Sequence, residues 1–343
     1  MTETPLVSVV IPHFNGAEIL DRCLTALQAS SYPALEVLLV DNASHDGSAV
    51  AAAERFASAR LRLIRLPENR GFAGGCNAGV REARGRYIVL LNNDAVAAPS
   101  FVGELVKAAE ADKAIGMVAA KVLQYSQRDV IDTVGHLLYP DGLNRGRGRL
   151  ERDEGQYDGC STALFPSGAA ALYARRMLDD VGLFEECLFL YGDDAELGLR
   201  GRVAGWGCAL APRAVAYHHY SRSAGAYSSL KAFYVERNRV LVLFRTFPFT
   251  LVVLSPAFTV ARLALQAWGA LTGRGAAGRL AAQTSVRHLI GVTLRAYGSA
   301  ILALPHILGE RWRHRRERRI GTRAFVALMR GHYLDAREGS LKD

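Results

Sequence analysis

The sequence predicts an α/β fold, with a Rossmann-like, mostly parallel sheet flanked by helices and a helical region at the carboxyl end. Between residues 6 and 122, short apolar runs alternate with segments of helical composition, the pattern of βαβ units with covered sheet faces. Beyond residue 246, two long apolar stretches precede a basic run. A chain of 343 residues is long enough for two domains, which we expect over residues 1–245 and 246–343.

Five apolar runs are expected to form the strands of the sheet. They are Val7 to Ile11, Val37 to Val40, Leu61 to Leu66, Tyr87 to Leu91 and Gly116 to Val122. The first four runs are each followed by a loop of polar residues, proline or glycine. The carboxyl ends of inner strands form the ligand-binding edge of an open α/β sheet. We therefore expect four polar side chains to gather at this edge, namely Asn15, Asp41, Asn69 and Asp94.

Segments of helical composition separate these strands. They are Glu18 to Ser30, Ser48 to Ala59, Gly75 to Arg84 and Ser100 to Ala111. The segment from Tyr125 to Phe165 is polar and rich in glycine and arginine, so we expect irregular structure or hairpins there. Order is expected to return at Ser167, before a helix over Arg175 to Val181.

The carboxyl-terminal region combines apolar stretches with concentrated positive charge. Phe247 to Leu271 and Leu289 to Leu308 are apolar but contain Arg262 and Arg295, and six arginines follow between residues 311 and 319. The chain has a net charge of +9, and this distribution favours an anionic cytoplasmic membrane surface over nucleic acid as the partner. Interfacial or re-entrant helices are favoured over true spans, because an arginine near the middle of a span is costly. A soluble helical subdomain or a homodimer surface is the remaining alternative.

Several other classes of protein are disfavoured by missing motifs. The first loop, Pro12 to Gly16, lacks the G-x-G-x-x-G fingerprint, and the chain has no G-x-x-x-x-G-K-[ST] motif, so a dehydrogenase or a P-loop nucleotidase is not expected. The five cysteines never form C-x-x-C, which argues against a zinc site or a disulfide framework and fits a reducing cytosol. The start of the chain lacks the features of a signal peptide. Amides and separated carboxylates instead suit a nucleotide and a metal-bridged diphosphate.

Seven sequence blocks, in order, resemble the inverting family 2 glycosyltransferases of the GT-A fold, especially the bacterial rhamnosyltransferase-like branch. The blocks are VSVVIPHFNG, LLVDNASHDGS, ENRGFAGGCNAG, YIVLLNNDA, FPSGAAALYARR, LFLYGDDAELGLRGRVAGW and AYHHYSRSAG, and the resemblance covers about residues 5–245. It implies transfer of a sugar from a nucleotide-sugar donor to a lipid-linked or polysaccharide acceptor in cell-envelope synthesis. The apolar and basic tail would keep this enzyme at the inner face of the plasma membrane, as a peripheral or integral protein.

The branch suggests dTDP-L-rhamnose as the donor, with a UDP-hexose, UDP-galactofuranose or a UDP-N-acetylhexosamine as alternatives. Two other classes stay open. A nucleotidyltransferase would share the sheet and the acidic site, but the loop from Pro12 to Gly16 contains no lysine or arginine to hold a triphosphate. A non-catalytic, nucleotide-binding assembly partner would bind the donor without turnover.

The resemblance assigns the nucleotide pocket to the loops after the first two strands. Asp41 would hydrogen-bond the pyrimidine ring, and Pro12, Phe14 and Asn15 would line the base and ribose pocket. The alternative for Asp41 is an ordinary loop and helix cap, and Asp46 is expected to be such a cap.

The glycine-rich segment from Glu68 to Asn77 is expected to bind the donor diphosphate or sugar hydroxyls. Its exposed backbone N–H groups at a helix start favour anions, and Asn69 and Asn77 are the side chains assigned to the donor. The alternative is a glycine-rich turn that binds no ligand.

The Asn92-Asn93-Asp94 motif stands where the family has D-x-D, with Asn92 in place of the first aspartate. The resemblance makes Asp94 a ligand of Mg²⁺ or Mn²⁺ and assigns Asn92 and Asn93 to donor binding. His218 would be an additional metal ligand or a diphosphate contact, and His219 is a weaker candidate.

The acidic cluster near residue 193 carries the expected acid–base chemistry. By the resemblance, Asp194 is the general base that takes the proton of the acceptor hydroxyl, and Asp193 is its partner. The alternative is a solvated acidic helix start. Ser167 and Gly168 are expected to line the acceptor and sugar pocket, and Trp206 lies on the acceptor side, where packing is favoured over sugar contact.

Overall fold

The computed structural model describes residues 4–219, 228–275, 278–279 and 285–341. The last part of the AYHHYSRSAG block, residues 220–225, lies outside the described residues. The chain forms two compact units, the first from residues 1–135 and 146–220 and the second from residues 136–145 and 221–343. The expected division at residue 245 falls at the end of a helix, α7 (Ser229–Thr246), that belongs to the second unit.

The first unit is an α/β fold around one large sheet, as the sequence predicts. Its strand order is β3-β2-β1-β4-β10-β6-β11-β5, and β7 also pairs with β6. The strands are β1 (Val7–His13), β2 (Leu35–Asp41), β3 (Leu61–Arg65), β4 (Tyr87–Leu91), β5 (Ala95–Ala97), β6 (Ile115–Gln124), β7 (Ile131–Thr133), β10 (Ala170–Ala174) and β11 (Gly207–His218).

Parallel pairing in one half of this sheet aligns the ends of neighbouring strands. The strands β3, β2, β1 and β4 are parallel, and the last residues of β1 and β2 are partners, His13 with Asp41. In the other half, β10 is antiparallel to β4 and β6, whereas β11 is parallel to β6 and antiparallel to β5. Both β1 and β4 are buried along their whole length, as expected of inner strands covered on two faces.

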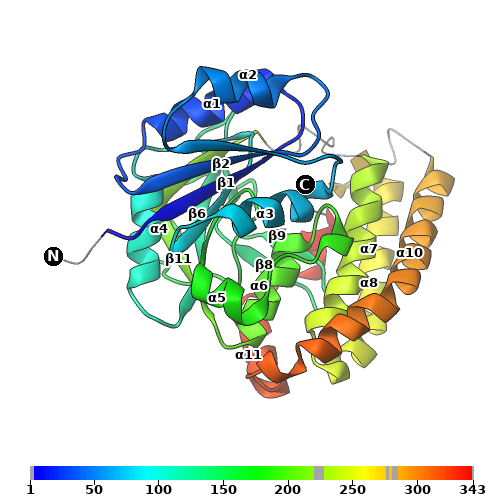
Figure 1. The fold of residues 1–343 in the computed structure, drawn as a ribbon. Helices are drawn as coiled ribbons and strands as arrows, with labels where there is room; N and C mark the ends of the chain where they lie inside the picture. Colours follow the sequence, from blue (N-terminus) through cyan, green and yellow to red (C-terminus); the bar gives the residue numbers. More distant parts are fainter. Residues whose placement is uncertain (1–3, 220–227, 276–277, 280–284, 342–343) are drawn as a thin grey trace. The chain divides into compact units, whose positions relative to one another are not determined.

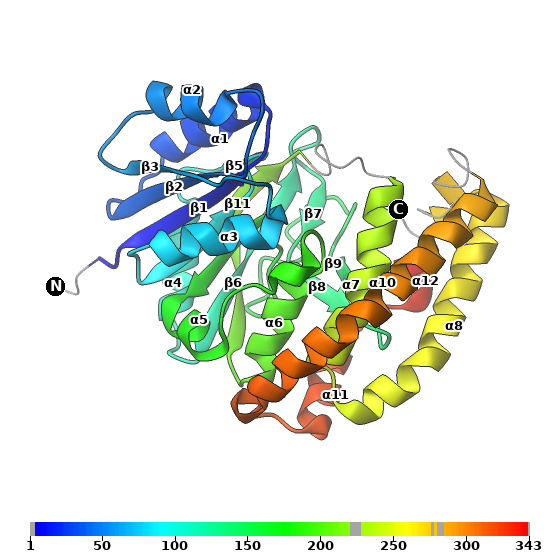
Figure 2. The ribbon, with the colours of Figure 1, turned by 45° about the vertical axis from the view of Figure 1, so that its right-hand side comes forward.

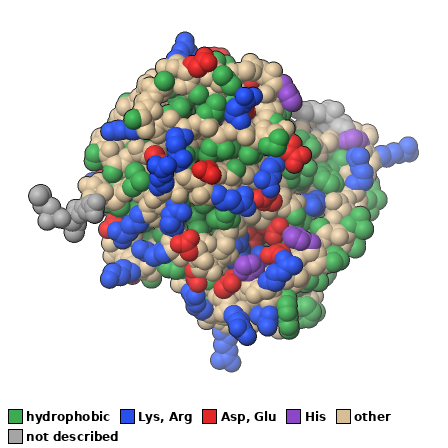
Figure 3. Space-filling model, viewed as in Figure 1, with side chains coloured by type: hydrophobic (Ala, Val, Ile, Leu, Met, Phe, Trp, Pro, Cys, Tyr) green, Lys and Arg blue, Asp and Glu red, His purple; other side chains and the backbone are tan. Residues whose placement is uncertain are grey.

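Helices cover both faces of the sheet, with α1 and α2 on one side of β1 and β2 and α3 on the other (Figure 1). The helices of this unit are α1 (Ala17–Gln28), α2 (Ser48–Arg55), α3 (Gly71–Glu82), α4 (Phe101–Glu110), α5 (Arg175–Val181) and α6 (Asp193–Val203), with a 3₁₀ turn η1 (Glu186–Leu188). On the face seen in Figure 3, acidic and basic side chains of this unit are interspersed.

Helix α3 begins four residues earlier than expected, at Gly71 rather than Gly75. Gly71 has a φ of +69°, and its carbonyl accepts a hydrogen bond from Asn42 Nδ2 at 2.9 Å. A Cβ atom at Gly79 would lie 2.3 Å from Val10 Cγ1. The glycines of this segment therefore serve the close packing of α3 on β1, in addition to any role in binding.

The second unit combines a short hairpin with a group of helices. The hairpin consists of β8 (His136–Leu138) and β9 (Asn144–Gly146), so hairpin structure does occur in the segment expected to be irregular or to form hairpins. Besides α7, the helices are α8 (Phe249–Thr272), α10 (Val286–Arg313), α11 (Thr322–Gly331) and α12 (Ala336–Leu341), with a 3₁₀ turn η2 (Arg315–Glu317). Helices α7 and α10 pack side by side (Figure 2).

A buried group of charged side chains joins the hairpin to the helices of this unit. Arg262 of α8 is fully buried, and its Nε lies 2.7 Å from Asp141 Oδ2 while its Nη1 lies 2.6 Å from Glu236 Oε1. Arg239 Nη1 donates a hydrogen bond to the carbonyl of Asp141 at 2.7 Å. Arg262 therefore faces the interior of the unit, and the apolar stretch that it interrupts in the sequence is one continuous helix.

Candidate active site

Asp94 and His218, the two expected metal ligands, come together at one edge of the sheet. The pairing of β11 with β5 sets His218 opposite Ala95, next to Asp94 in the chain. His218 Nε2 lies 3.2 Å from Asp94 Oδ1 and 3.5 Å from Asn92 Nδ2, and both Asp94 and His218 are buried. His219 donates its backbone N–H to the carbonyl of Asp94 at 3.0 Å, and its ring stacks on Tyr125.

The oxygens around His218 have the chemistry that a divalent cation requires. Within the described part of the chain, Asn92 Oδ1 is buried without a hydrogen-bond donor, and the buried Asp94 Oδ1 lies 3.2 Å from His218 Nε2. A buried oxygen without a donor is costly, and an oxygen-seeking cation such as Mg²⁺ or Mn²⁺ would satisfy it. Asp94 and His218 therefore fit the metal site that the sequence predicts, and Asn92, which the sequence assigns to donor binding, offers a further oxygen beside them.

The charges of this group depend on one another. Burial lowers the pKa of His218, but its bonds to Asp132 and Asp94 raise that pKa to about 10. Burial raises the pKa of Asp94, and the neighbouring His218 lowers it by more, so the net shift is downward. The His218 ring thus carries the positive charge beside Asp94, and a divalent cation held there would take the place of its Nε2 proton.

Asp132 is a member of this site that the sequence analysis missed. Its Oδ2 accepts a hydrogen bond from His218 Nδ1 at 2.8 Å, and its Oδ1 lies 2.9 Å from Arg149 Nη1. Asp132 belongs to β7, within the polar segment that was expected to be irregular or to form hairpins. No spacing or composition signal marks it, because its contacts are made with residues far away in the sequence.

His13, at the end of β1, holds the side chain of Asn93. Asn93 Nδ2 lies 2.8 Å from His13 Nδ1, and His13 Nε2 lies 2.7 Å from Ser48 Oγ, which in turn bonds Asp46 Oδ1 at 2.5 Å. Burial lowers the pKa of His13 more than the nearby Asp46 and Asp41 raise it, which favours the neutral ring. The amide nitrogen of Asn93 is therefore engaged within the protein. The sequence analysis identified neither His13 nor Ser48.

Hydrogen bonds stabilise the loops after β1 and β2, which are expected to hold the base and ribose. Asn15, with a φ of +57°, accepts a hydrogen bond from the backbone N–H of His45 at 2.9 Å. Asp41 Oδ1 accepts one from the N–H of Ser44 at 2.8 Å. Phe14 is 40% exposed, and its ring is nearly perpendicular to that of His45. These contacts hold the two loops together, and Phe14 is an accessible aromatic ring on them.

Pro12 and Asp46 hold these loops in place, Pro12 by packing and Asp46 by hydrogen bonds. Pro12 is buried under α3, where a Cβ atom at Gly75 would lie 3.2 Å from Pro12 Cβ. Asp46 accepts hydrogen bonds from the N–H groups of Gly16 at 2.7 Å and Ser48 at 3.1 Å. Burial raises the pKa of Asp46, but these two bonds, the bond from the Ser48 hydroxyl and the nearby His13 together lower it to about 2. Asp46 therefore joins the two loops one residue before the N-cap of α2, which is Gly47 and not Asp46 as expected.

The amides of the glycine-rich segment bond mainly within the protein. Asn69 is exposed and accepts hydrogen bonds from the N–H of Gly71 at 2.9 Å and from Asn42 Nδ2 at 3.1 Å. Asn77 is buried, donates to the carbonyl of Phe184 at 2.9 Å and to Glu186 Oε1 at 2.9 Å, and accepts from the Phe184 N–H at 3.0 Å. These bonds engage both ends of the Asn77 amide, which anchors the segment before η1.

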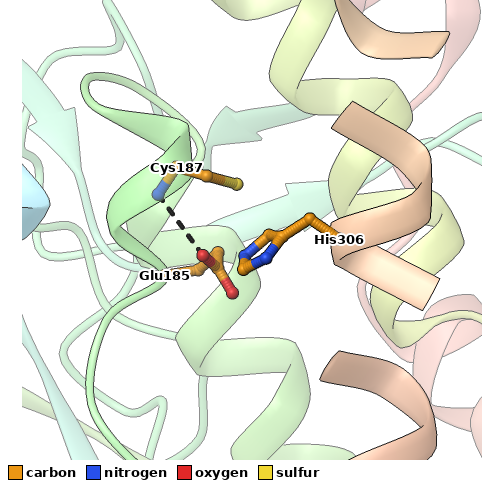
Figure 4. A group of neighbouring side chains, drawn as sticks. All are labelled: Glu185, Cys187 and His306. Carbon is orange, nitrogen blue, oxygen red and sulfur yellow. Dashed lines mark hydrogen bonds between the residues drawn. The ribbon is translucent and has the colours of Figure 1, made fainter. Parts of the chain in front are cut away.

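The η1 turn lies between Asn77 and the acidic helix start. Glu185 Oε1 accepts a hydrogen bond from the backbone N–H of Cys187 at 3.3 Å, which closes the first residues of the turn (Figure 4). Glu186 is also bonded to Arg70 Nη2 at 2.5 Å. The segment that leads into α6 is thus fixed by bonds to the start of α3.

Asp193 and Asp194 begin α6 and differ in burial. Asp193 is buried, and its burial together with the adjacent Asp194 carboxylate raises its pKa well above the usual range. Asp194 is partly exposed, and its Oδ2 accepts a hydrogen bond from the Gly168 N–H at 3.1 Å. The more accessible carboxylate of the pair is therefore Asp194, the one expected to be the general base.

One loop connects Asp194 to the turn that carries Asn92 and Asp94. The N–H of Asn92 donates to the carbonyl of Ala169 at 2.9 Å, and the neighbouring Gly168 bonds Asp194. Ser167 Oγ accepts a hydrogen bond from the N–H of Ala169 at 3.3 Å. Trp206 donates its indole N–H to Asp180 Oδ2 at 2.7 Å, in keeping with the packing role favoured from the sequence.

Comparisons with known proteins place this geometry among sugar-transferring enzymes. Residues 8–182 match the family model described as glycosyl transferase family 2. The chain is 27% identical over 228 residues to "O-antigen biosynthesis protein RfbC" of Myxococcus xanthus, covering 64% of this chain and 18% of that protein. It is 26% identical over 246 residues to "N-acetylglucosaminyl-diphospho-decaprenol L-rhamnosyltransferase" of Mycobacterium tuberculosis, covering 65% and 78%.

Solved structures share the fold. "Mannosyltransferase PcManGT from Pyrobaculum calidifontis in complex with GDP-Man and Mn2+" aligns with a TM-score of 0.54 and 20% identity, over 88% of this chain and 87% of that one. "GalNAc-T7 with UDP, GalNAc and Mn2+" aligns with a TM-score of 0.58 and 17% identity, over 71% of this chain and 48% of that one. These likenesses confirm the expected GT-A type of α/β fold.

Proposed function

Because this chain belongs to glycosyl transferase family 2 and is a glycosyltransferase, we propose that it transfers a sugar, with inversion, from a nucleotide-sugar to a lipid-linked or polysaccharide acceptor in cell-envelope glycan synthesis. One observation carries the proposal: the loop that bonds Asp194 through Gly168 also bonds the turn of Asn92 and Asp94 through Ala169. Gly168 and Ala169 thus hold both the carboxylate proposed to act on the acceptor and the turn proposed to bind the donor diphosphate.

Asp194 is the proposed general base. Inversion requires the acceptor oxygen to attack the anomeric carbon opposite the departing nucleotide while a carboxylate removes the hydroxyl proton. The hydrogen bond from Gly168 to Asp194 Oδ2 fixes the carboxylate and leaves it partly exposed to an acceptor. Asp193, with its raised pKa, keeps its own proton, so the pair avoids placing a buried negative charge beside the Asp194 carboxylate.

Asn92, Asp94 and His218 are the proposed holders of Mg²⁺ or Mn²⁺. When bound, the cation supplies positive charge that stabilises the departing nucleoside diphosphate. Asp41, Asn15 and the exposed ring of Phe14 are proposed to bind the base and ribose at the adjacent strand ends. Ser167 and Gly168 are proposed to line the sugar pocket.

Nucleotide release from a panel of donors tests the reaction and the donor together. We propose dTDP-L-rhamnose as the donor, supported by the similarity to the L-rhamnosyltransferase of Mycobacterium tuberculosis. The panel includes UDP-hexoses, UDP-galactofuranose and UDP-N-acetylhexosamines, with Mg²⁺ or Mn²⁺ and membrane lipid extract as the acceptor source. Release from a UDP-sugar with none from dTDP-L-rhamnose would refute the rhamnosyl assignment.

Asp194→Asn is expected to lower the turnover rate about 10²–10⁴-fold, the usual contribution of a general base. Donor binding, measured by titration in the absence of acceptor, should change little. The matched control is Asp179→Asn, at an exposed aspartate of α5. Full activity of Asp194→Asn would remove this residue from the role of base.

The second unit is proposed to bind the inner face of the plasma membrane. Helices α8 and α10 are long and apolar enough to cross a membrane by length and composition, yet Arg295 is exposed on α10, which favours an interfacial position. Exposed apolar side chains on these helices are Phe249, Val253, Leu254, Val260, Leu271, Ile290, Leu294, Ile301 and Leu302. Exposed arginines, including Arg313, Arg315 and Arg316, supply the charge for anionic lipid.

Vesicle flotation tests this surface. The full chain should float with vesicles that contain phosphatidylglycerol and much less with purely phosphatidylcholine vesicles, and Leu302→Glu should weaken flotation because Leu302 is 84% exposed. Flotation that is unaffected by lipid charge and by this change would contradict the proposal. A discrete dimer in solution whose interface is lost in Leu302→Glu would instead assign the surface to a second copy of the chain.

A further inference from the structure

The bulge in β7 directs Asp132 toward His218. Val122 pairs with Thr133 and Leu123 pairs with Ile131, so Asp132 is the extra residue between two consecutive pairs. A bulge of this kind turns the side chain of the extra residue away from the regular alternation of the strand. The bulge lies beside the end of β6, where Gln124 pairs with His218 of β11. The carboxylate of Asp132 thereby reaches the imidazole of His218.

The bond from Asp132 determines which nitrogen of His218 faces the site. Asp132 Oδ2 lies 2.8 Å from His218 Nδ1, and an ionised carboxylate accepts, so Nδ1 is the donor. Nε2 is then the nitrogen that faces Asp94, at 3.2 Å. A neutral imidazole bound in this way presents the Nε2 lone pair to a cation, in the manner of the carboxylate–histidine pairs that support metal ligands.

Arg149 holds Asp132 from the other side. Arg149 Nη1 lies 2.9 Å from Asp132 Oδ1, and both side chains are largely buried. The strand that carries Asp132 is bonded to the segment that carries Arg149 at two places, from Ile131 N–H to the Glu151 carbonyl at 2.8 Å and from Leu150 N–H to the Ile131 carbonyl at 2.9 Å. Both oxygens of Asp132 are therefore engaged, and the carboxylate has little freedom to turn away from His218.

We propose that Asp132 is a positioning residue that holds His218 with Nε2 directed at Asp94, and so determines the affinity of this site for a divalent cation. The inference rests on the metal site of the proposed function and adds a residue to it. Asp132 acts through His218, without touching the cation or the sugar donor.

Mn²⁺ binding to the full chain, without donor or acceptor, tests this role. Free Mn²⁺ is measured by electron paramagnetic resonance during titration. Asp132→Ala is expected to weaken Mn²⁺ binding about 10–100-fold, the usual effect of losing such a supporting carboxylate. Asp132→Asn, which keeps the size of the side chain, should weaken it in the same direction. The matched control is Asp153→Asn, because Asp153 pairs with Lys121 at 2.9 Å and contacts none of these residues.

A double-mutant cycle separates positioning from a general structural effect. If Asp132 acts through His218, Asp132→Ala should add no further loss of Mn²⁺ affinity in a His218→Ala background. The ¹⁴N coupling of a bound imidazole in the electron spin echo spectrum of Mn²⁺ should be present in the wild type and absent or reduced in Asp132→Asn. An equal loss in both backgrounds, or unchanged Mn²⁺ affinity in both Asp132 variants, would overturn the inference.

The same experiments separate this inference from the proposed function. Nucleotide release that depends on Asp194 while Mn²⁺ affinity is independent of Asp132 would leave the transferase standing and refute the positioning role. Absence of nucleotide release from every donor, together with Mn²⁺ binding that depends on Asp132, would refute the transferase and leave the positioning role standing.

Discussion

At the scale of single residues, the neighbouring carboxylates Asp193 and Asp194 differ in burial and in hydrogen bonding. Asp193 is buried with a raised pKa, whereas Asp194 is partly exposed and held by the N–H of Gly168. The separation arises at the first turn of α6, where consecutive side chains point in directions about 100° apart on the helix. Asp193 can therefore keep its proton next to the more accessible Asp194, which suits a base that has to work beside a second acid.

The raised pKa of Asp193 predicts a pH dependence of stability. A carboxyl group whose pKa is higher in the folded state binds its proton more tightly there, so stability is full below the unfolded pKa of about 3.9 and is lost as the pH rises toward the folded value. The variant Asp193→Asn has no carboxyl group at this position and does not lose this stability as the pH rises. The melting temperature of the variant minus that of the wild type should therefore increase steadily from pH 5 to pH 8. The same difference at pH 5 and pH 8, or an equal increase in the exposed control Asp179→Asn, would contradict the prediction.

Residues of the site differed in how well the sequence could reveal them. Asp94, His218 and Asp194 stand in motifs that carry a family resemblance. In the structure, His218 Nε2 lies 3.2 Å from Asp94 Oδ1. Asp132, His13 and Asn42 were missed, because their roles depend on contacts across 86, 80 and 27 positions of the chain. The sequence assigned Asn77 to the donor, whereas in the structure Phe184 and Glu186 accept hydrogen bonds from its amide. Nothing in the sequence around Asn77 indicates these two distant partners.

At the scale of elements, the glycines of α3 determine how closely this helix approaches the sheet. A Cβ atom at Gly79 would lie 2.3 Å from Val10 Cγ1 and 3.0 Å from Val40 Cγ2, atoms of two buried strands that cannot move easily. Helix α3 starts at Gly71, beside Asn69 and Asn42, so its distance from β1 also places the loop assigned to the donor.

Gly79→Ala is expected to destabilise the protein by about 1–3 kcal/mol, the usual cost of an extra methyl group in a packed core. Gly103→Ala in α4 is the matched control, because its nearest neighbour is Tyr32 Cδ2 at 3.9 Å and the glycine is helical. That change should stabilise by roughly 0.5–1 kcal/mol through the lower backbone entropy of the unfolded chain. Thermal unfolding of both variants measures the difference, and equal effects would show that packing at Gly79 is not tight.

The sequence predicted the parallel half of the sheet better than the half that mixes parallel and antiparallel pairs. The strand expected over Tyr87 to Leu91 has those bounds, and β1 extends the expected run by two residues to His13. By contrast, neither β10 nor β11 was predicted as a strand. Strand β10 is a five-residue run that is mostly alanine, and β11 contains a proline at position 212, so neither shows an alternating pattern or strong strand propensity. Their pairing across the sheet, rather than their local sequence, makes them strands.

At the scale of the whole molecule, the second unit depends on a hairpin that the chain supplies from within the first. Residues 136–145 belong to the second unit, while the residues before and after them belong to the first. Asp141 of this hairpin is fully buried beside Arg262, which is itself fully buried. The arginine that interrupts the apolar stretch of α8 in the sequence thus has an internal partner, which the sequence could not reveal because 121 positions separate the two residues.

Asp141→Asn is expected to destabilise the second unit by about 3–5 kcal/mol, because it leaves the buried guanidinium of Arg262 without one of its two carboxylate partners. The double variant Asp141→Leu with Arg262→Met should recover much of this loss, since a well-packed apolar pair replaces a buried ion pair at little cost. Asp335→Asn, at an exposed residue of the same unit, is the control. Chemical unfolding of the full chain measures the loss of stability, and hydrogen exchange at residues 136–145 reports on the hairpin itself. A wild-type exchange rate in Asp141→Asn would contradict the prediction.

The position of this hairpin in the chain also determines when it can be completed during synthesis. Asp141 leaves the ribosome 121 residues before Arg262, and at about 5–20 residues per second this interval lasts roughly 6–24 s. Strands β10 and β11 of the first unit are themselves made within this interval, and Arg262 is made only after both of them. The ion pair between Asp141 and Arg262 therefore cannot form until every strand of the first unit has been synthesised.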